Sequence, residues 1–195
     1  MEQPPDAARE LFSHYSSIIG RLSQALPERF QPKLDEVRQG LPLLFRPHYP
    51  MVLNHDNLLE MNIHVDEATG CITGVVGWSD IKIAPFDTSL GGLETFLGVE
   101  TSSSWLFHPE HGYFRRQFWE TFYGVTGYLS DNDWRAIEVG RMLGLFRTYG
   151  FDRRPEKDNA APLQEGDQGF VCLEAFCLRQ ASPFPELRSQ AGGHP

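Results

Sequence analysis

The strongest constraint on the fold is a short alternating segment in the first half of the chain. Residues 62–66 (NIHVD) alternate between apolar and polar side chains, and residues 72–76 (ITGVV) are rich in β-branched side chains. The residues between them include Glu67-Ala68-Thr69-Gly70, a composition typical of a turn that ends on glycine. The sequence therefore predicts an antiparallel β-hairpin over residues 62–77.

The segment before this hairpin has the spacing of helices. Apolar side chains recur at helical intervals from Leu11 to Leu26, and Pro27 ends that pattern. A second, shorter helix is expected over residues 28–39, before the proline-rich stretch 41–50. We therefore expect residues 1–50 to form N-terminal helices that pack on the rest of the protein.

The chain after Pro85 is predicted to be helical, with Ser130 and Asp167 as N-caps of two of its helices. The expected helices cover residues 89–97, 109–126, 131–149 and 167–178. Together with the hairpin, this pattern predicts an α+β fold that is mainly α and has one β-hairpin.

Two patterns within the helix predicted over 109–126 concern the core. Phe114, Phe118 and Phe122 recur every four residues, which predicts that they face the core. Arg115 and Arg116 are adjacent charges, which are typical of a solvated face.

Composition argues against several classes of function. The net charge of −9 and the lack of a Lys/Arg run disfavour a nucleic-acid-binding protein. No apolar run is long enough to span a membrane, and the first residues lack a signal-peptide pattern. Cys71, Cys172 and Cys177 are odd in number and are expected to be reduced thiols. We therefore expect a cytoplasmic protein with no nucleic-acid or membrane partner.

The residues between His55 and Gly98 contain a set of motifs in a recognisable order. They are His55, Asn62, Asp66, Gly74-Val75-Val76, Trp78, Pro85-Phe86 and Leu93-Glu94. This order resembles the aminoglycoside-phosphotransferase (APH) and choline-kinase-like family, particularly its divergent fungal members. The resemblance implies a protein-kinase-like fold, of which this chain carries the C-terminal lobe (C-lobe).

The chain departs from that family at the two carboxylates that the family's chemistry requires. Asn57 occupies the position of the catalytic aspartate, and Gly77 occupies that of the metal-binding aspartate before the tryptophan. Phosphoryl transfer needs one carboxylate to accept the proton of the attacking hydroxyl and another to hold Mg²⁺. Residues 1–50 also contain no Gly-rich phosphate loop, so the nucleotide-binding N-lobe is expected to be absent or vestigial.

The resemblance places the candidate site residues in and after the loop. The candidates are His55, Asp56 and Asn57 for catalysis, and Trp78, Asp80 and Asn62 for substrate binding. In the functional interpretation His55 is a base that Asp56 orients. In the structural interpretation His55 bonds the loop backbone as a remnant, Asn62 braces the loop and Trp78 lies in the core.

No cofactor and no metal are expected. His108 and His111 flank Glu110, but no third ligand accompanies them in the sequence.

Three functional hypotheses follow. The first is a degenerate phosphotransferase-fold protein without kinase activity, repurposed to bind an apolar small molecule and to catalyse a cofactor-free cyclisation or isomerisation in fungal secondary metabolism. The second is a pseudo-phosphotransferase that acts as a binding or regulatory module, with a protein partner or a second copy on an exposed apolar surface. The third is an active ATP-dependent phosphotransferase in which Asp56 and Asp80 replace the missing groups.

The predicted organisation has three parts. Residues 1–50 form the N-terminal helices, residues 51–181 form the kinase-like C-lobe, and residues 182–195 form a frayed tail. Within the lobe we expect a catalytic-loop remnant over 54–62, the hairpin over 62–77 and helices over 88–180.

Overall fold

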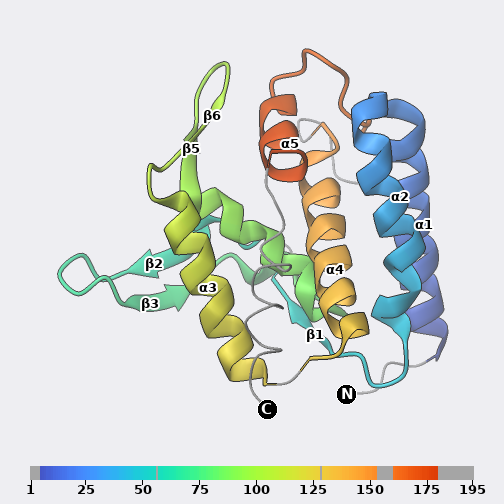
Figure 1. Ribbon diagram of the computed structural model, residues 1–195, viewed down its shortest axis with the longest axis horizontal. Helices are drawn as coiled ribbons and strands as arrows, with labels where there is room; N and C mark the ends of the chain where they lie inside the picture. Colours follow the sequence, from blue (N-terminus) through green and yellow to red (C-terminus); the bar gives the residue numbers. More distant parts are fainter. Residues whose placement is uncertain (1–4, 56, 128, 153–159, 180–195) are drawn as a thin grey trace.

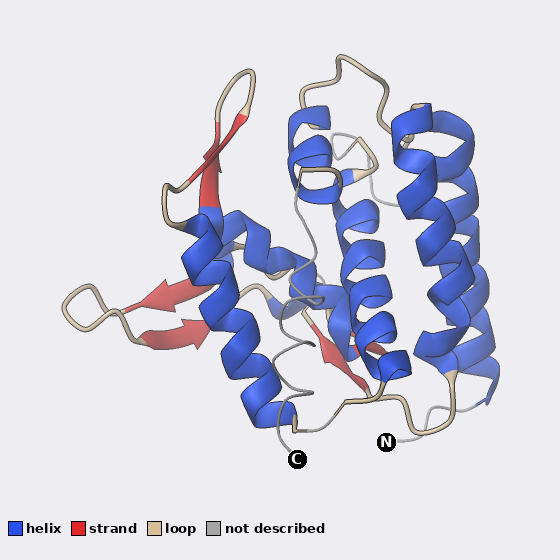
Figure 2. Cartoon of the chain, in the orientation of Figure 1, coloured by secondary structure: helices blue, strands red, loops and turns tan. Residues whose placement is uncertain are grey.

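The fold combines a helical body with short strand pairs on one side (Figures 1 and 2). The structure is a computed structural model that describes residues 5–55, 57–127, 129–152 and 160–179. Its α-helices are α1 (Pro5–Ala25), α2 (Gln31–Gly40), α3 (His111–Thr126), α4 (Asp131–Tyr149) and α5 (Phe170–Cys177). Its 3-10 helices are η1 (Glu28–Phe30), η2 (Leu41–Phe45), η3 (Glu60–Asn62), η4 (Trp78–Asp80) and η5 (Phe86–Leu97). The predicted α+β class, mainly α, is confirmed.

The strands form three separate antiparallel pairs. They are β1 (Met51–Asn54) with β4 (Lys82–Pro85), β2 (Ile63–Val65) with β3 (Ile72–Val75), and β5 (Gly98–Glu100) with β6 (Trp105–Phe107). The β2–β3 pair is the predicted hairpin, with Gly70 at φ 69° in its turn. The prediction of a single hairpin was wrong, because β5 and β6 form a second one within the region expected to be helical.

Helix α4 is the centre of the main core. Helices α1 and α2 lie side by side on one flank of it, and α5 packs near its C-terminal end (Figure 1). One cluster of buried side chains joins these helices, with Leu22, Phe30, Leu34, Leu143, Phe146 and Phe176 all almost fully buried. The described residues before β1 therefore share their core with the C-terminal helices. The tail expected over 182–195 lies outside the described residues.

Two glycines let η5 approach α4 closely. A side chain at Gly140 would collide with the carboxyl group of Asp87, and one at Gly144 would collide with the backbone carbonyl of Thr88. Since Gly140 and Gly144 are four residues apart, they lie on one face of the helix. This face fixes where η5 runs and, through it, where the strands β1 and β4 sit.

Helix α4 begins as the sequence predicts. The Ser130 hydroxyl accepts a hydrogen bond from the backbone N–H of Asp133, and the Asp133 carboxylate accepts one from the backbone N–H of Ser130, a capping box. The predicted cap at Asp167 was wrong. Helix α5 begins after Gly169, and the Asp167 carboxylate instead accepts a hydrogen bond from the N–H of Gln164.

Helix α3 faces the body with a set of residues that matches the predicted one only in part. Arg115 and Trp119 are its buried positions, whereas Phe114 is 43% exposed and Phe118 and Phe122 are half-buried. Phe118 and Phe122 pack against a core cluster, as predicted. The predictions that Phe114 lies in the core and that Arg115 is solvated were wrong. Trp119 packs against Trp134 and Ile137 of α4 in a second, smaller cluster.

A buried ion network explains why Arg115 turns inward. Its guanidinium donates to both carboxylate oxygens of Glu94, at 3.3 and 2.8 Å, and both side chains are at most 8% exposed. Arg141 of α4 lies 3.7 Å from the same carboxylate and donates to Glu138 at 2.9 and 3.0 Å. Burial lowers the pKa of Arg141, but the negative charges of Glu138 and Glu94 raise it by more, so the net shift is upward. The network thereby joins η5, α3 and α4 with two positive and two negative charges.

No helix in the part of the chain that the structure describes is both long and apolar enough to cross a lipid bilayer.

We predict that Glu94→Gln lowers the free energy of unfolding by about 3 kcal/mol or more, because it leaves buried guanidinium charge uncompensated. Urea unfolding measures the change. Glu36→Gln is the control, since Glu36 pairs with Lys33 on the surface and such pairs contribute at most about 1 kcal/mol. Equal losses in the two variants would show that the Glu94 network does not hold the three helices together.

Candidate functional site

The loop that carries the predicted site begins at Asn54, the last residue of β1. Its side chain is buried, and its Nδ2 donates to the carbonyls of Ala84 and Pro85 at 2.9 and 3.1 Å. Its Oδ1 accepts a hydrogen bond from the hydroxyl of Ser89 at 2.5 Å. Asn54 therefore ties the start of the loop to the junction of β4 and η5. Sequence analysis did not single out Asn54, although it directly precedes the loop histidine.

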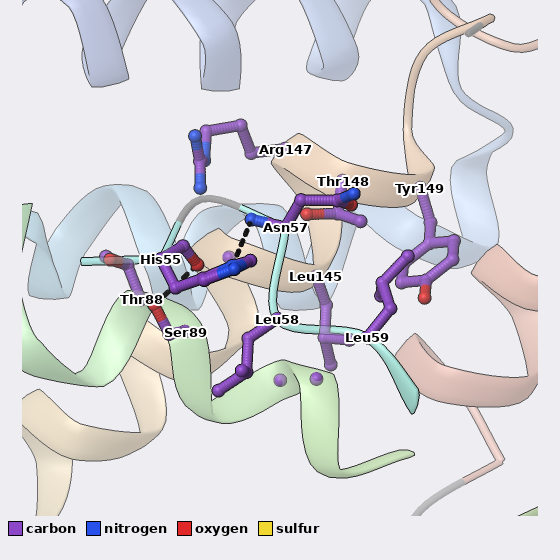
Figure 3. Close-up of a pocket in the computed structure, with 13 residues that line it drawn as sticks. His55, Asn57, Leu58, Leu59, Thr88, Ser89, Leu145, Arg147, Thr148 and Tyr149 are labelled. Carbon is purple, nitrogen blue, oxygen red and sulfur yellow. Dashed lines mark hydrogen bonds between the residues drawn. The ribbon is translucent and has the colours of Figure 1, made fainter. Parts of the chain in front are cut away.

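Both ring nitrogens of His55 are used within the loop. Nε2 lies 2.7 Å from the carbonyl oxygen of Val76, and Nδ1 lies 3.3 Å from the backbone nitrogen of Asn57 (Figure 3). The carbonyl only accepts and the backbone N–H only donates, so these contacts assign the neutral tautomer with its proton on Nε2. The side chain is 5% exposed and its ring meets that of Trp78 edge to face, with centroids 4.8 Å apart.

The two asparagines of the loop lie next to each other. Nδ2 of Asn62 donates to the backbone carbonyl of Asn57 at 2.7 Å, and the backbone N–H of Val76 donates to the carbonyl of Asn62 at 2.9 Å. Asn62 thus bridges the loop and the end of β3. Gly77 has φ 81°, in the left-handed region, and a Cβ added there would lie 2.9 Å from Oδ1 of Asn62. Position 77 therefore faces Asn62.

The remaining candidates do not converge on one point. Trp78 is 47% exposed, so the expectation that it lies in the core was wrong, and its Nε1 donates to the carbonyl of Val75 at 2.8 Å. Asp80 is the last residue of η4, but its side chain lies outside what the structure describes. Asp56 also lies outside the described residues.

A small cavity lies between the loop, η5 and α4. Its volume is about 20 Å³, and Figure 3 shows that loop side chains lie over it together with residues from the C-terminal half of α4. The lining residues are His55, Asn57, Leu58, Leu59, Thr88, Ser89, Gly91, Gly92, Gly144, Leu145, Arg147, Thr148 and Tyr149. A space of this size holds about one water molecule. Of the six candidate residues, His55 and Asn57 line it.

A larger cavity of about 220 Å³ lies near the C-terminal end of α4. Phe151, Leu163, Asp167 and Cys172 are among its lining residues. None of the four candidate site residues whose side chains the structure describes lines it. The residues that the resemblance singles out therefore border only the smaller space.

A buried carboxyl group lies beside the loop, at the start of η5. Asp87 is 0% exposed, and the hydroxyl of Tyr49 donates to its Oδ2 at 2.5 Å. No hydrogen-bond partner of its Oδ1 occurs among the residues that the structure describes. Burial raises the pKa of Asp87 to about 7, although the Tyr49 hydrogen bond and the charge of Arg46 act in the opposite direction. The sequence gives no sign of this group, because Tyr49 and Gly140, which enclose it, are distant along the chain.

Ligands for a metal do not gather anywhere in the described part of the chain, where no group of three or more His, Cys, Asp and Glu side chains could hold an ion. The imidazole of His111 instead lies 3.1 Å from the guanidinium of Arg115. Burial and the charge of Arg115 lower the pKa of His111. Nδ1 of His108 accepts the backbone N–H of Glu110 at 3.1 Å.

Comparison of the chain with family models, with curated proteins and with solved structures finds no significant match.

We predict that the Tm of the protein falls as the pH rises from about 5 to about 8, and that Asp87→Asn removes most of this fall. The folded state holds the Asp87 proton more tightly than the unfolded chain, whose carboxyl has an ordinary pKa of 3.8. This contribution is complete below about pH 4 and is lost as the pH rises through about 7, with a limiting size on the order of 4 kcal/mol.

Thermal unfolding followed by circular dichroism over this pH range measures the effect. Asp66→Asn is the matched control, because the exposed Asp66 accepts hydrogen bonds from Thr69 that lower its pKa. Its titration therefore lies below the tested range. A wild-type pH profile that Asp87→Asn leaves unchanged would contradict the prediction.

Proposed function

We propose that this chain is a degenerate phosphotransferase-fold protein without kinase activity that serves as a binding module for a protein partner. In this proposal the chain keeps the arrangement of a kinase-like C-lobe, and the former catalytic loop has a structural role only. The resemblance assigns Asn62 and position 77 to one metal site, which requires them to face one another. The 2.9 Å approach of a Cβ at position 77 to the Asn62 amide supports that assignment.

The hydrogen bonds of the loop support the absence of phosphoryl transfer. The ring nitrogens of His55 are satisfied by Val76 and Asn57, which leaves the imidazole no nitrogen for a substrate proton. Asn57 and Gly77 supply no carboxylate where the chemistry requires two. The loop is therefore suited to hold β1, the hairpin and η5 together.

The observation that carries the proposal is the exposure of apolar side chains on the two small sheets beside the loop. Leu53 and Ile83 are directly paired across β1 and β4 and are 62% and 37% exposed. Val65 and Ile72 are paired across the β2–β3 hairpin and are 54% and 66% exposed. Cross-strand partners lie on the same face of a sheet, so each sheet presents an apolar pair to its surroundings.

The same segment contributes most of the exposed large apolar side chains among the residues that the structure describes. Of the fifteen such side chains in the described ranges, nine lie between residues 52 and 83. We refer to the two cross-strand pairs, Leu53–Ile83 and Val65–Ile72, as the strand-side surface. The other exposed large apolar residues of the segment are Val52, Met61, Val76, Trp78 and Ile81. Concentrated apolar exposure of this kind is typical of a surface that another molecule covers.

The small-molecule hypothesis receives less support from the geometry. Pockets that enclose drug-sized ligands measure about 300–1,000 Å³, whereas the cavity beside His55 measures about 20 Å³. A cyclisation or isomerisation at His55 would require the loop to move away from η5 and α4. The proposed binding module needs no such movement.

We predict that ATP leaves the Tm of the protein unchanged whether or not Mg²⁺ is present. A ligand at 100 times its dissociation constant stabilises a protein by about 2.7 kcal/mol, which a thermal-shift titration detects readily. ATP with EDTA is the control for effects that do not depend on the metal. A rise in Tm that requires Mg²⁺ would overturn the proposal and favour the active phosphotransferase with Asp56 and Asp80.

We further predict that replacing both Leu53 and Ile83 by Gln abolishes the capture of a partner protein from cells that express this chain. Val125→Gln is the matched control, because Val125 is 83% exposed and belongs to the last turn of α3, not to a strand. Mass spectrometry identifies the proteins retained by wild type and control and lost by the double variant. Identical sets from all three baits, each shown to be folded by circular dichroism, would contradict the prediction.

A further inference from the structure

The charges around the strand-side surface distinguish between its two potential occupants. Residues 52–83 contain five acidic side chains and one basic side chain, a net charge of −4 out of −9 for the whole chain. The acidic residues are Asp56, Glu60, Asp66, Glu67 and Asp80, and the basic residue is Lys82. This segment of 32 residues thus carries nearly half of the net negative charge of a protein of 195 residues.

Three of these acidic residues are placed around the exposed apolar side chains. Glu60 is exposed in η3, directly before Met61, which is 68% exposed. Asp66 and Glu67 are exposed at the tip of the β2–β3 hairpin, directly after Val65. The apolar side chains of the hairpin therefore have carboxylates at both ends, an arrangement like the polar rim that surrounds the apolar centre of an interface.

A second copy of the chain fits this surface poorly. In a symmetric dimer the same patch meets itself, so the exposed carboxylates of Glu60, Asp66 and Glu67 would meet those of a second copy. Like charges brought within a Debye length of about 10 Å repel one another, and the cost increases as water is excluded. A partner with basic residues around an apolar face would instead pair its charges with the rim.

We infer that the partner of the strand-side surface is a different protein that presents an apolar face rimmed by Lys and Arg, and that the chain does not dimerise through this surface. This inference rests on the proposed function and specifies its partner. The apolar pairs Leu53–Ile83 and Val65–Ile72 supply the contact area, and Glu60, Asp66 and Glu67 select the partner by charge. The binding is therefore weakened by salt.

The test uses a defined probe, an amphipathic helical peptide of Leu and Lys, and its counterpart with Glu in place of Lys. Fluorescence anisotropy measures the binding of each peptide to the full chain and to two charge variants of equal net charge. One variant neutralises the rim with Glu60→Gln and Glu67→Gln. The other neutralises two exposed residues elsewhere, Glu10→Gln in α1 and Glu28→Gln in η1.

We expect the Lys peptide to bind wild type and the remote variant equally and the rim variant about fivefold more weakly. That factor corresponds to about 1 kcal/mol for the two exposed rim charges together. We expect the Glu peptide to bind none of them. Equal binding of the Lys peptide to both charge variants would overturn the inference, since attraction to net charge alone would then explain it.

Analytical ultracentrifugation of the protein at low and high salt supplies the second readout, and a monomer is expected at both. A dimer that Leu53→Gln with Ile83→Gln dissociates would overturn the inferred partner but leave the proposed binding surface intact. The proposed function itself fails if that double variant binds the Lys peptide as wild type does. Val65→Gln with Ile72→Gln on the hairpin replaces the double variant if the first pair proves unstable.

Discussion

The buried carboxylate of Glu94 is the interaction on which the arrangement of the helical body depends. Glu94 lies near the end of η5, and its two oxygens meet guanidinium groups from α3 and α4. Each of these charges is costly to bury alone, and only the relative placement of the three helices allows them to be buried together. On α3, Arg115 is buried by this network, whereas Phe114 beside it in the sequence is 43% exposed.

This constraint extends from the ion network to the loop through η5. Gly140 and Gly144 of α4 bring the first residues of η5 against the helix, which buries Asp87 and leaves Ser89 in reach of Asn54. Asn54 then fixes the start of the loop, and His55 fixes its position against the end of β3. The loop is thus positioned from both sides by backbone and amide contacts. A loop held in this way has few polar groups left for a substrate.

Local patterns allowed the prediction of elements whose stabilising contacts are close in sequence. The β2–β3 hairpin and the Ser130 cap of α4 are examples, because their defining residues lie within a few positions of each other. The β5–β6 hairpin was missed because three-residue strands are too short to show alternation. The burial of Arg115 on α3 was missed because its pairing with Glu94 spans 21 residues, a distance at which sequence spacing carries no signal.

At the candidate site, too, the sequence identified some residues but not the groups that they contact. These contacts affect how the surface beside the loop is interpreted. The sequence named His55 and Asn62, but their partners are backbone carbonyls and N–H groups that no residue pattern identifies. Because these polar groups of the loop are already hydrogen-bonded, the neighbouring strands are the main part of this region that other molecules can contact. Those strands carry paired apolar side chains on exposed faces, which folding alone does not require. In the proposed interface, the surplus of carboxylates along the same segment would make association with a second copy unfavourable and a basic partner favourable.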